Sequence, residues 1–216
     1  MKKAVLFLPI IAILFVQGCV DTTSRATGVY MLLDTSGTYA KELENAQTII
    51  KYLVGTLNPG DSLAIARIDS GSFSEKDIIA KVTFDNRPSV ANSQKRAFVQ
   101  IIEDFTKNVK GSTYTDINGG LLQAEDFLTE KGSGRKIVLI YSDLMEELPK
   151  GHVRDFELKL AGFEVIALNV TKLRSDIKDP KQYMKRIDHW RDRVEAGGGT
   201  WKVINDLDRL EAIFEQ

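Results

Sequence analysis

This chain of 216 residues has one cysteine, no excess of basic over acidic residues and few long apolar runs. A single cysteine excludes a disulfide framework and a cysteine-rich zinc or iron–sulfur site. The 29 Lys and Arg residues face 30 Asp and Glu, so the net charge is −1, and a nucleic-acid-binding module is excluded for want of a positive field. Neither a phosphate-binding Gly-x-x-x-x-Gly-Lys-Ser/Thr loop nor a Gly-x-Ser-x-Gly nucleophile elbow is present. With 43% hydrophobic residues, the chain has enough apolar material for one folded core.

The most apolar stretch lies at the N-terminus. Residues 4–16 carry no charge and follow two lysines, at positions 2 and 3. The stretch is thirteen residues long and contains Pro9, whereas a membrane-spanning helix needs roughly 20 residues. This length and charge pattern predict the hydrophobic region of a secretory signal peptide.

The stretch ends in Val16-Gln17-Gly18-Cys19, which resembles the lipobox of bacterial lipoproteins. In that family a small residue precedes the cysteine, which becomes lipidated and N-terminal after cleavage. The resemblance implies a signal peptide over 1–18, a lipidated Cys19 with a polar tether over 19–27, and a folded domain over 28–216. The alternatives are an uncleaved anchor and an ordinary signal peptide.

The expected location is the cell envelope. Two or more acyl chains on Cys19 anchor a protein stably, whereas one chain gives only reversible binding. In enteric lipoproteins an Asp directly after the lipidated cysteine marks retention in the inner membrane, but here Val20 takes that position. If the host has two membranes, this points to the outer membrane, with the domain facing the periplasm.

Alternating strand and helix patterns predict an α/β domain. Residues 29–33 and 137–141 are unbroken apolar runs, typical of parallel strands that are covered on both faces. Residues 80–84 follow the strand at 63–68 too closely for a helical crossover, so they are expected to form an antiparallel edge strand. The remaining strands are expected at 163–168 and 200–204.

Apolar residues at helical spacing fill the gaps between these strands. The stripes predict helices around residues 43–54, 98–105, 121–128, 183–194 and 207–214. The whole pattern is that of a doubly wound, Rossmann-like sheet with helices on both faces, mostly parallel and with one antiparallel edge strand.

Oxygen-bearing side chains follow the strands that are expected to be central. The first strand runs into Asp34, Ser36 and Thr38, at alternate positions of one loop, and the apolar strand at 137–141 runs into Asp143. Thr115 precedes a helix that must begin at the same edge of the sheet. Because ligands bind at the carboxyl ends of parallel strands, these five side chains are the candidate site.

This set contains carboxylates and hydroxyls but no histidine or thiolate. Such donors suit a hard divalent cation, with Mg²⁺ expected first and Mn²⁺ or Ca²⁺ as alternatives. Two carboxylates balance the charge of the ion, and neutral hydroxyls leave it able to attract one more anionic oxygen. A partner's Asp or Glu fits that position.

The three motifs resemble, in order, the metal-ion-dependent adhesion site of the von Willebrand factor A-type domain. The resemblance spans 28–216. It implies that Ser36, Thr38 and Thr115 are direct ligands, and that Asp34 and Asp143 act directly or through water. The family more often has serine at the position of Thr38. It also has glycine after the last aspartate, where this chain has Leu144, a change expected to affect the loop and the metal affinity.

Two other interpretations compete. In the first, Ser36 or Thr38 caps the helix that contains Leu43, Thr115 or Asp116 caps the next helix, and the protein is a metal-free scaffold lipoprotein. In the second, the Asp34-x-Ser36-x-Thr38 loop belongs to a Mg²⁺-dependent phosphatase resembling the haloacid dehalogenases, with Asp34 as nucleophile. Ser36, however, stands where that family has its second acid.

The preferred prediction is a membrane-anchored binding module without enzymatic activity. Its cation is expected to bridge to an acidic residue of an envelope or extracellular protein. Nucleic acid is not expected as a partner.

Overall fold

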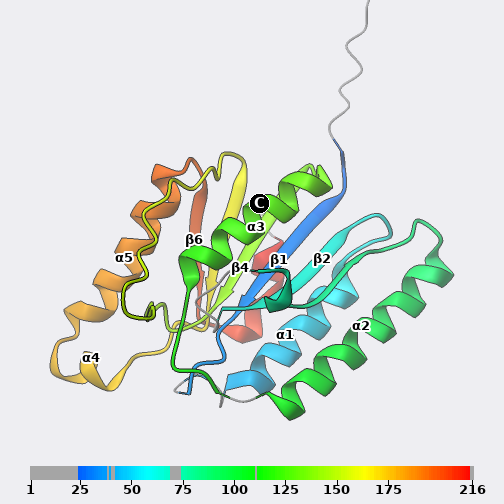
Figure 1. Cartoon of the computed structure of the whole chain (residues 1–216). Coiled ribbons are helices and arrows are strands. Elements are labelled where there is room, and N and C mark those ends of the chain that lie inside the picture. Colours follow the sequence, from blue (N-terminus) through cyan, green and yellow to red (C-terminus); the bar gives the residue numbers. More distant parts are fainter. Residues whose placement is uncertain (1–23, 38, 40–41, 69–73, 110, 215–216) are drawn as a thin grey trace, which may run out of the picture.

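Strands and helices alternate along the chain in a computed structural model that describes residues 24–37, 39, 42–68, 74–109 and 111–214 (Figure 1). The strands are β1 (Thr27–Leu33), β2 (Ser62–Arg67), β3 (Ile78–Thr83), β4 (Arg135–Tyr141), β5 (Phe163–Leu168) and β6 (Thr200–Ile204). The α-helices are α1 (Leu43–Thr56), α2 (Pro88–Asn108), α3 (Ile117–Lys131), α4 (Arg174–Lys178) and α5 (Lys181–Ala196). Two 3₁₀ helices, η2 (Glu75–Asp77) and η3 (Leu207–Ile213), complete the described elements.

The strands form one six-stranded sheet in the order β3-β2-β1-β4-β5-β6. All neighbours are parallel except β2 and β3, so the predicted antiparallel edge strand is confirmed. β1 and β4 lie side by side in register, with Leu33 opposite Tyr141. The residues that follow these two strands therefore meet at one point of the sheet edge, where the strand order reverses.

Helices cover both faces of the sheet (Figure 1). Alternate residues of β1 point to opposite faces, as the pleat of a strand requires. Val29, Met31 and Leu33 pack with α1, α2 and η3, while Tyr30 and Leu32 pack with α3 and α5. Because both faces are buried, every side chain from Val29 to Leu33 is apolar or aromatic, which explains the unbroken run in the sequence.

The C-terminal element differs from the prediction. An α-helix was expected over 207–214, but residues 207–213 form the 3₁₀ helix η3, with non-helical angles at Arg209. A stripe of three apolar residues specifies which side is buried and does not distinguish the two helix types. The predicted stripe of Leu207, Leu210 and Phe214 is only partly buried against the core. The fully buried residues of this element are Ala212 and Ile213.

The connection from β4 to β5 is an irregular strap over residues 142–162, with neither helix nor strand. Side chains fasten it to the domain. Arg154 forms an ion pair of 2.7 Å with Asp116 at the start of α3, and Arg193 of α5 donates to the backbone oxygen of Phe156 at 3.0 Å. Leu158 and Leu160 are buried in the core between the sheet and α5. The strap thereby holds its first residues, which follow β4, against the sheet edge.

A close backbone contact between the strap and α5 gives a first prediction. A methyl group added at Gly197 lies 2.7 Å from the backbone oxygen of Leu158, although the backbone angles of Gly197 suit any residue. We expect Gly197→Ala to lower the free energy of unfolding by about 1–3 kcal/mol, because a crowded backbone contact has to open. Urea titration followed by circular dichroism measures the change.

Gly55 of α1 is the matched control, since an added methyl there meets nothing within 4 Å. Gly55→Ala is expected to raise stability by up to about 1 kcal/mol through helix propensity. If Gly197→Ala is as stable as Gly55→Ala, the strap does not lie against α5 as described.

Candidate metal centre

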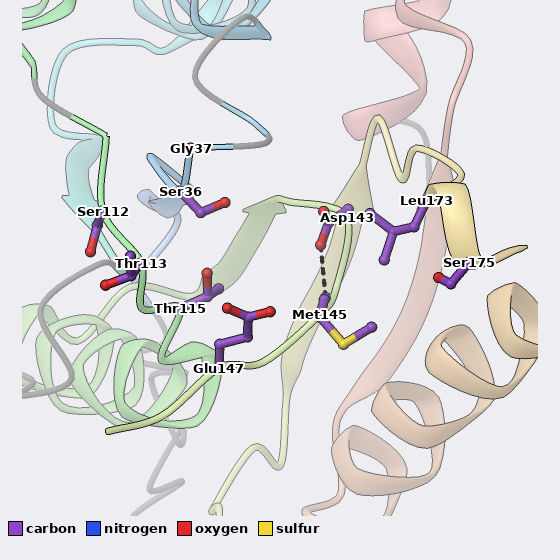
Figure 2. A pocket seen from close by; sticks show the side chains of 10 residues that line it. All are labelled: Ser36, Gly37, Ser112, Thr113, Thr115, Asp143, Met145, Glu147, Leu173 and Ser175. Atoms are coloured by element: carbon purple, nitrogen blue, oxygen red, sulfur yellow. Dashed lines mark hydrogen bonds between the residues drawn. The ribbon is translucent and has the colours of Figure 1, made fainter. Parts of the chain in front are cut away.

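A polar pocket of about 470 Å³ opens at the carboxyl edge of the sheet, next to the ends of β1 and β4. Figure 2 shows side chains from several segments around it. The lining residues come from the loop after β1, the loop before α3, the strap and the segment leading into α4: Ser36, Gly37, Ser112, Thr113, Thr115, Asp143, Met145, Glu147, Leu173 and Ser175. Three of the five residues predicted from the sequence, Ser36, Thr115 and Asp143, share this pocket.

Asp34 is buried just after β1, with only 1% of its surface exposed, two residues before Ser36, which lines the pocket. Its backbone N–H donates to the Tyr141 oxygen at 3.0 Å, which continues the β1–β4 ladder by one residue. Its Oδ1 accepts the Ser36 N–H at 2.8 Å, and its Oδ2 accepts the Ser142 hydroxyl at 2.6 Å. These contacts orient the Asp34 carboxylate between the loop after β1 and the turn after β4.

Asp143 is the second carboxylate, and it is buried at the end of β4. Its Oδ1 accepts the Met145 N–H at 2.9 Å. Burial raises the pKa of Asp143 to about 6, and the charges of Asp34 and Glu147 raise it as well, while the Met145 bond and the Arg186 guanidinium lower it. The ionised form of this carboxyl is therefore costly in the metal-free protein.

The buried Arg186 contacts the backbone of Asp143 but does not line the pocket. Arg186 donates through Nε to the backbone oxygen of Asp143 at 3.1 Å, and both ends of its guanidinium bind Asp176 at 2.8 Å. Because the guanidinium is paired with Asp176, it only partly offsets the charge of Asp143. Among the described lining residues, none is lysine, arginine or histidine.

Leu144 adopts the left-handed conformation that glycine favours, with φ of 66°. Two bonds hold it there. Its N–H donates to the Ser142 hydroxyl at 3.0 Å, and its oxygen accepts the Trp190 indole N–H at 3.1 Å. Its side chain is buried in the core. The turn after Asp143 thus has a glycine-like backbone although its residue is leucine.

Two backbone bridges join the loops around the pocket. The Gly37 N–H donates to the Ser112 oxygen at 3.0 Å, and the Ser112 N–H donates to the Thr35 oxygen at 3.1 Å. Thr115 and Glu147 exchange both backbone bonds, at 2.8 and 2.9 Å. These bridges fix the hydroxyl-bearing residues relative to the ends of β1 and β4.

The helix-cap interpretation is confirmed at Asp116 but not at Ser36 or Thr115. The residue before α1 is Glu42, with no side-chain cap. The cap of α3 is Asp116, whose Oδ1 accepts the Gly119 N–H at 2.8 Å. Ser36 and Thr115 therefore cap neither helix and line the pocket instead. Thr38 lies outside the described residues.

The donors around the pocket fit a hard cation. No group of three or more His, Cys, Asp or Glu side chains within the described residues is arranged to hold a metal ion. Two carboxylates and the hydroxyls of Ser36 and Thr115 form a mixed oxygen set instead, which suits Mg²⁺, Mn²⁺ or Ca²⁺ better than zinc or copper. The repulsion between Asp34 and Asp143 is of the kind that a cation relieves.

Sequence reasoning missed Ser142, Met145 and Glu147. Ser142 directly precedes Asp143, and its hydroxyl spans from Asp34 to the Leu144 backbone. Its position after a central strand was the available signal. Met145 and Glu147 reach the pocket through the strap, which has no periodic pattern to reveal it.

Solved structures share this fold at low sequence identity. No protein-family model and no curated protein matches the chain. A von Willebrand factor type A protein from Catenulispora acidiphila matches 88% of this chain at 16% identity, with a TM-score of 0.54. The fold is von Willebrand factor A-like.

A second structure with this A-like fold is the pilus adhesin SpaC from Lactobacillus rhamnosus GG, in an open conformation. It matches 89% of this chain at 13% identity, with a TM-score of 0.55. This chain covers 41% of the Catenulispora chain and 29% of the SpaC chain. The shared part is therefore one domain of those longer chains.

The raised pKa of Asp143 predicts a pH-dependent stability in chelator-treated protein. The folded pKa is about 6 and the ordinary value is 3.8, so between these values the folded state holds a proton that the unfolded state lacks. Stability from this group is therefore lost as the pH rises through 6. Asp143→Asn keeps the shape and the acceptor for Met145, and we expect it to be about 2–3 kcal/mol more stable than the wild type at pH 7.5.

Urea titrations of both proteins between pH 4 and 7.5 measure this difference. The advantage of Asp143→Asn should shrink through pH 6 and vanish near pH 4. A difference that stays constant with pH contradicts the account of Asp143.

Proposed function

We propose that this chain is a membrane-anchored, cation-dependent protein-interaction module without enzymatic activity. The observation that carries the proposal is the pair of buried carboxylates, Asp34 and Asp143, at the ends of β1 and β4, next to a pocket that contains no basic side chain among its described lining residues. Two buried like charges repel each other unless a cation, a proton or a basic group intervenes, and a bound cation relieves this repulsion.

The cation site consists of side chains from three loops. Ser36 and Thr115 offer hydroxyl oxygens, Asp34 and Asp143 offer carboxylates directly or through water, and Thr38 completes the set proposed from the sequence. A bound Mg²⁺, Mn²⁺ or Ca²⁺ supplies an electron-poor position facing the pocket mouth. The two aspartates balance its charge, and the hydroxyls add none.

The partner is a protein of the envelope or the extracellular space that presents an Asp or Glu to this position. The shared fold of the SpaC pilus adhesin supports a protein partner. One ionic contact does not carry specific affinity alone, so neighbouring surface must contribute. Met145 and Leu173 line the pocket beside the carboxylates and favour a partner with apolar residues next to its acid.

The membrane anchor is the acylated Cys19, which lies outside the described residues. None of the described helices has the length and apolar character needed to cross a bilayer. β1 begins at Thr27, on the sheet edge opposite the pocket, and its seven residues span roughly 20 Å. An anchor ahead of Thr27 is therefore attached at the end of β1 opposite the cation site, which leaves the site accessible to a partner. In a host with two membranes, the expected place is the outer membrane.

A phosphatase is not proposed. The haloacid dehalogenase pattern requires an acid two residues after its nucleophile to protonate the leaving group, and Ser36 has no such proton to give at neutral pH.

Metal titration gives the direct test. Calorimetry with Mg²⁺, Mn²⁺ and Ca²⁺ on the full chain in a non-ionic detergent is expected to detect one bound ion. Asp34→Ala and Thr115→Ala should weaken binding at least about tenfold, because each removes an oxygen donor. Thr115→Ala keeps the backbone bonds to Glu147, so its fold is retained even if that of Asp34→Ala is not.

Thr129→Ala is the matched control for Thr115→Ala, since Thr129 is an exposed residue near the other end of α3. It should bind metal like the wild type. Absence of ion binding by the wild type, or unchanged binding by Thr115→Ala, contradicts the proposed site.

The anchor makes a separate prediction. In bacterial cells fed radioactive palmitate, the wild type should be labelled and remain in the membrane fraction after carbonate extraction. Cys19→Ser should be unlabelled, because no other cysteine is available to carry acyl chains. Equal labelling of the two proteins rules out lipidation at Cys19.

A further inference from the structure

Glu147 lies at the mouth of the pocket, and its backbone is fixed against Thr115. The two residues exchange both N–H···O bonds, at 2.8 and 2.9 Å, as an antiparallel bridge. Directly opposed residues of such a bridge project their side chains to the same side, with Cβ atoms roughly 5 Å apart. The Glu147 carboxylate and the Thr115 hydroxyl therefore emerge together, and Figure 2 shows both directed into the pocket.

The Glu147 carboxylate has no hydrogen bond or ion pair with any described residue, although it stands among polar groups. Its neighbour Glu146 is different, because the Glu146 carboxylate accepts bonds from both the backbone N–H and the side-chain amide of Asn118. Glu147 is also close enough to Asp143 for its charge to raise the pKa of that residue. A third negative charge thus faces a pocket that already holds two.

The position of this carboxylate has a consequence for any cation in the pocket. Asp34 is buried and is oriented by Ser36 and Ser142, while Glu147 is an exposed lining residue, on the side that a partner can reach. A glutamate has three rotatable side-chain bonds, so a change of rotamer moves its oxygens within the pocket without moving the backbone bridge. The chain thereby carries a carboxylate of the type expected from its partner.

We propose that Glu147 binds the same cation from the mouth of the pocket and occupies the position that a partner's acidic side chain takes. This inference rests on the cation site of the proposed function. Glu147 raises the affinity for the cation, and a partner's carboxylate has to displace it. In the domain alone, Glu147 then occupies the coordination position of the partner's carboxylate. A partner binds only if its contacts with the surrounding surface supply enough free energy to displace Glu147.

Mn²⁺ binding tests the proposal, because Mn²⁺ reports both affinity and bound water. The full chain in a non-ionic detergent is titrated with Mn²⁺, followed by electron paramagnetic resonance for free ion and by water proton relaxation for the waters on bound ion. Glu147→Gln keeps the side-chain size and removes the charge. We expect it to bind Mn²⁺ roughly tenfold more weakly and to show higher relaxation per bound ion, since water replaces the carboxylate.

A small carboxylate then stands in for the partner. Glutarate should lower the relaxation of the Mn²⁺-loaded Glu147→Gln protein at concentrations several-fold below those needed for the wild type. Glu130→Gln is the matched control, since Glu130 is an exposed carboxylate near the far end of α3 and should behave like the wild type.

The possible failures are distinguishable. If the wild type and Glu147→Gln bind Mn²⁺ with the same affinity, relaxation and glutarate response, the role of Glu147 is overturned and the cation site stands. If neither protein binds Mn²⁺, the proposed cation site is overturned, and the role of Glu147 with it.

Discussion

Asp34 and Asp143 are held near each other because β1 and β4 are parallel neighbours in register. A sheet with this strand order brings the ends of these two strands to the same point, and both carboxylates are buried there. Charge repulsion in a poorly solvated place disfavours this arrangement, as the raised pKa of Asp143 reflects. The loops that follow the strands donate hydrogen bonds to the two carboxylates from the Ser142 hydroxyl and from the backbone N–H groups of Ser36 and Met145. A pocket lies next to these loops.

The turn after β4 is held in an unfavourable backbone conformation by its contacts with neighbouring residues. Leu144 takes a left-handed backbone, which costs roughly 1–2 kcal/mol for a residue with a side chain. Its buried side chain and its bonds to Ser142 and Trp190 offset that cost. Ser142 also donates to Asp34, so one hydroxyl couples the strained turn to the carboxylate on the neighbouring strand. Leu144 has the backbone conformation that glycine would adopt here. Any effect of the leucine on metal affinity therefore comes from the contacts of its side chain and not from a different turn.

The sequence predicts the sheet well, since short apolar runs such as residues 137–141 are typical of strands that are covered on both faces. The same runs locate Asp34 and Asp143, which follow them directly. Glu147 could not be found in this way, because its position depends on a bridge to Thr115 that lies 32 positions away in an irregular segment. The 3₁₀ form of η3 was missed because a short apolar stripe fits both helix types. Thr38 and Cys19 remain predictions.

The strap between β4 and β5 has a consequence for how this molecule can change over evolutionary time. A helix at this place would tie each residue to its neighbours through backbone bonds, so that substitutions would propagate along it. The strap is instead fastened at separate points, by Arg154 to Asp116, by Arg193 to Phe156 and by buried leucines. The stretch between the Glu147 bridge and Arg154 can therefore diverge in length and side chains while the sheet and its paired aspartates stay as they are. One scaffold can in this way give rise to descendants that recognise different surfaces.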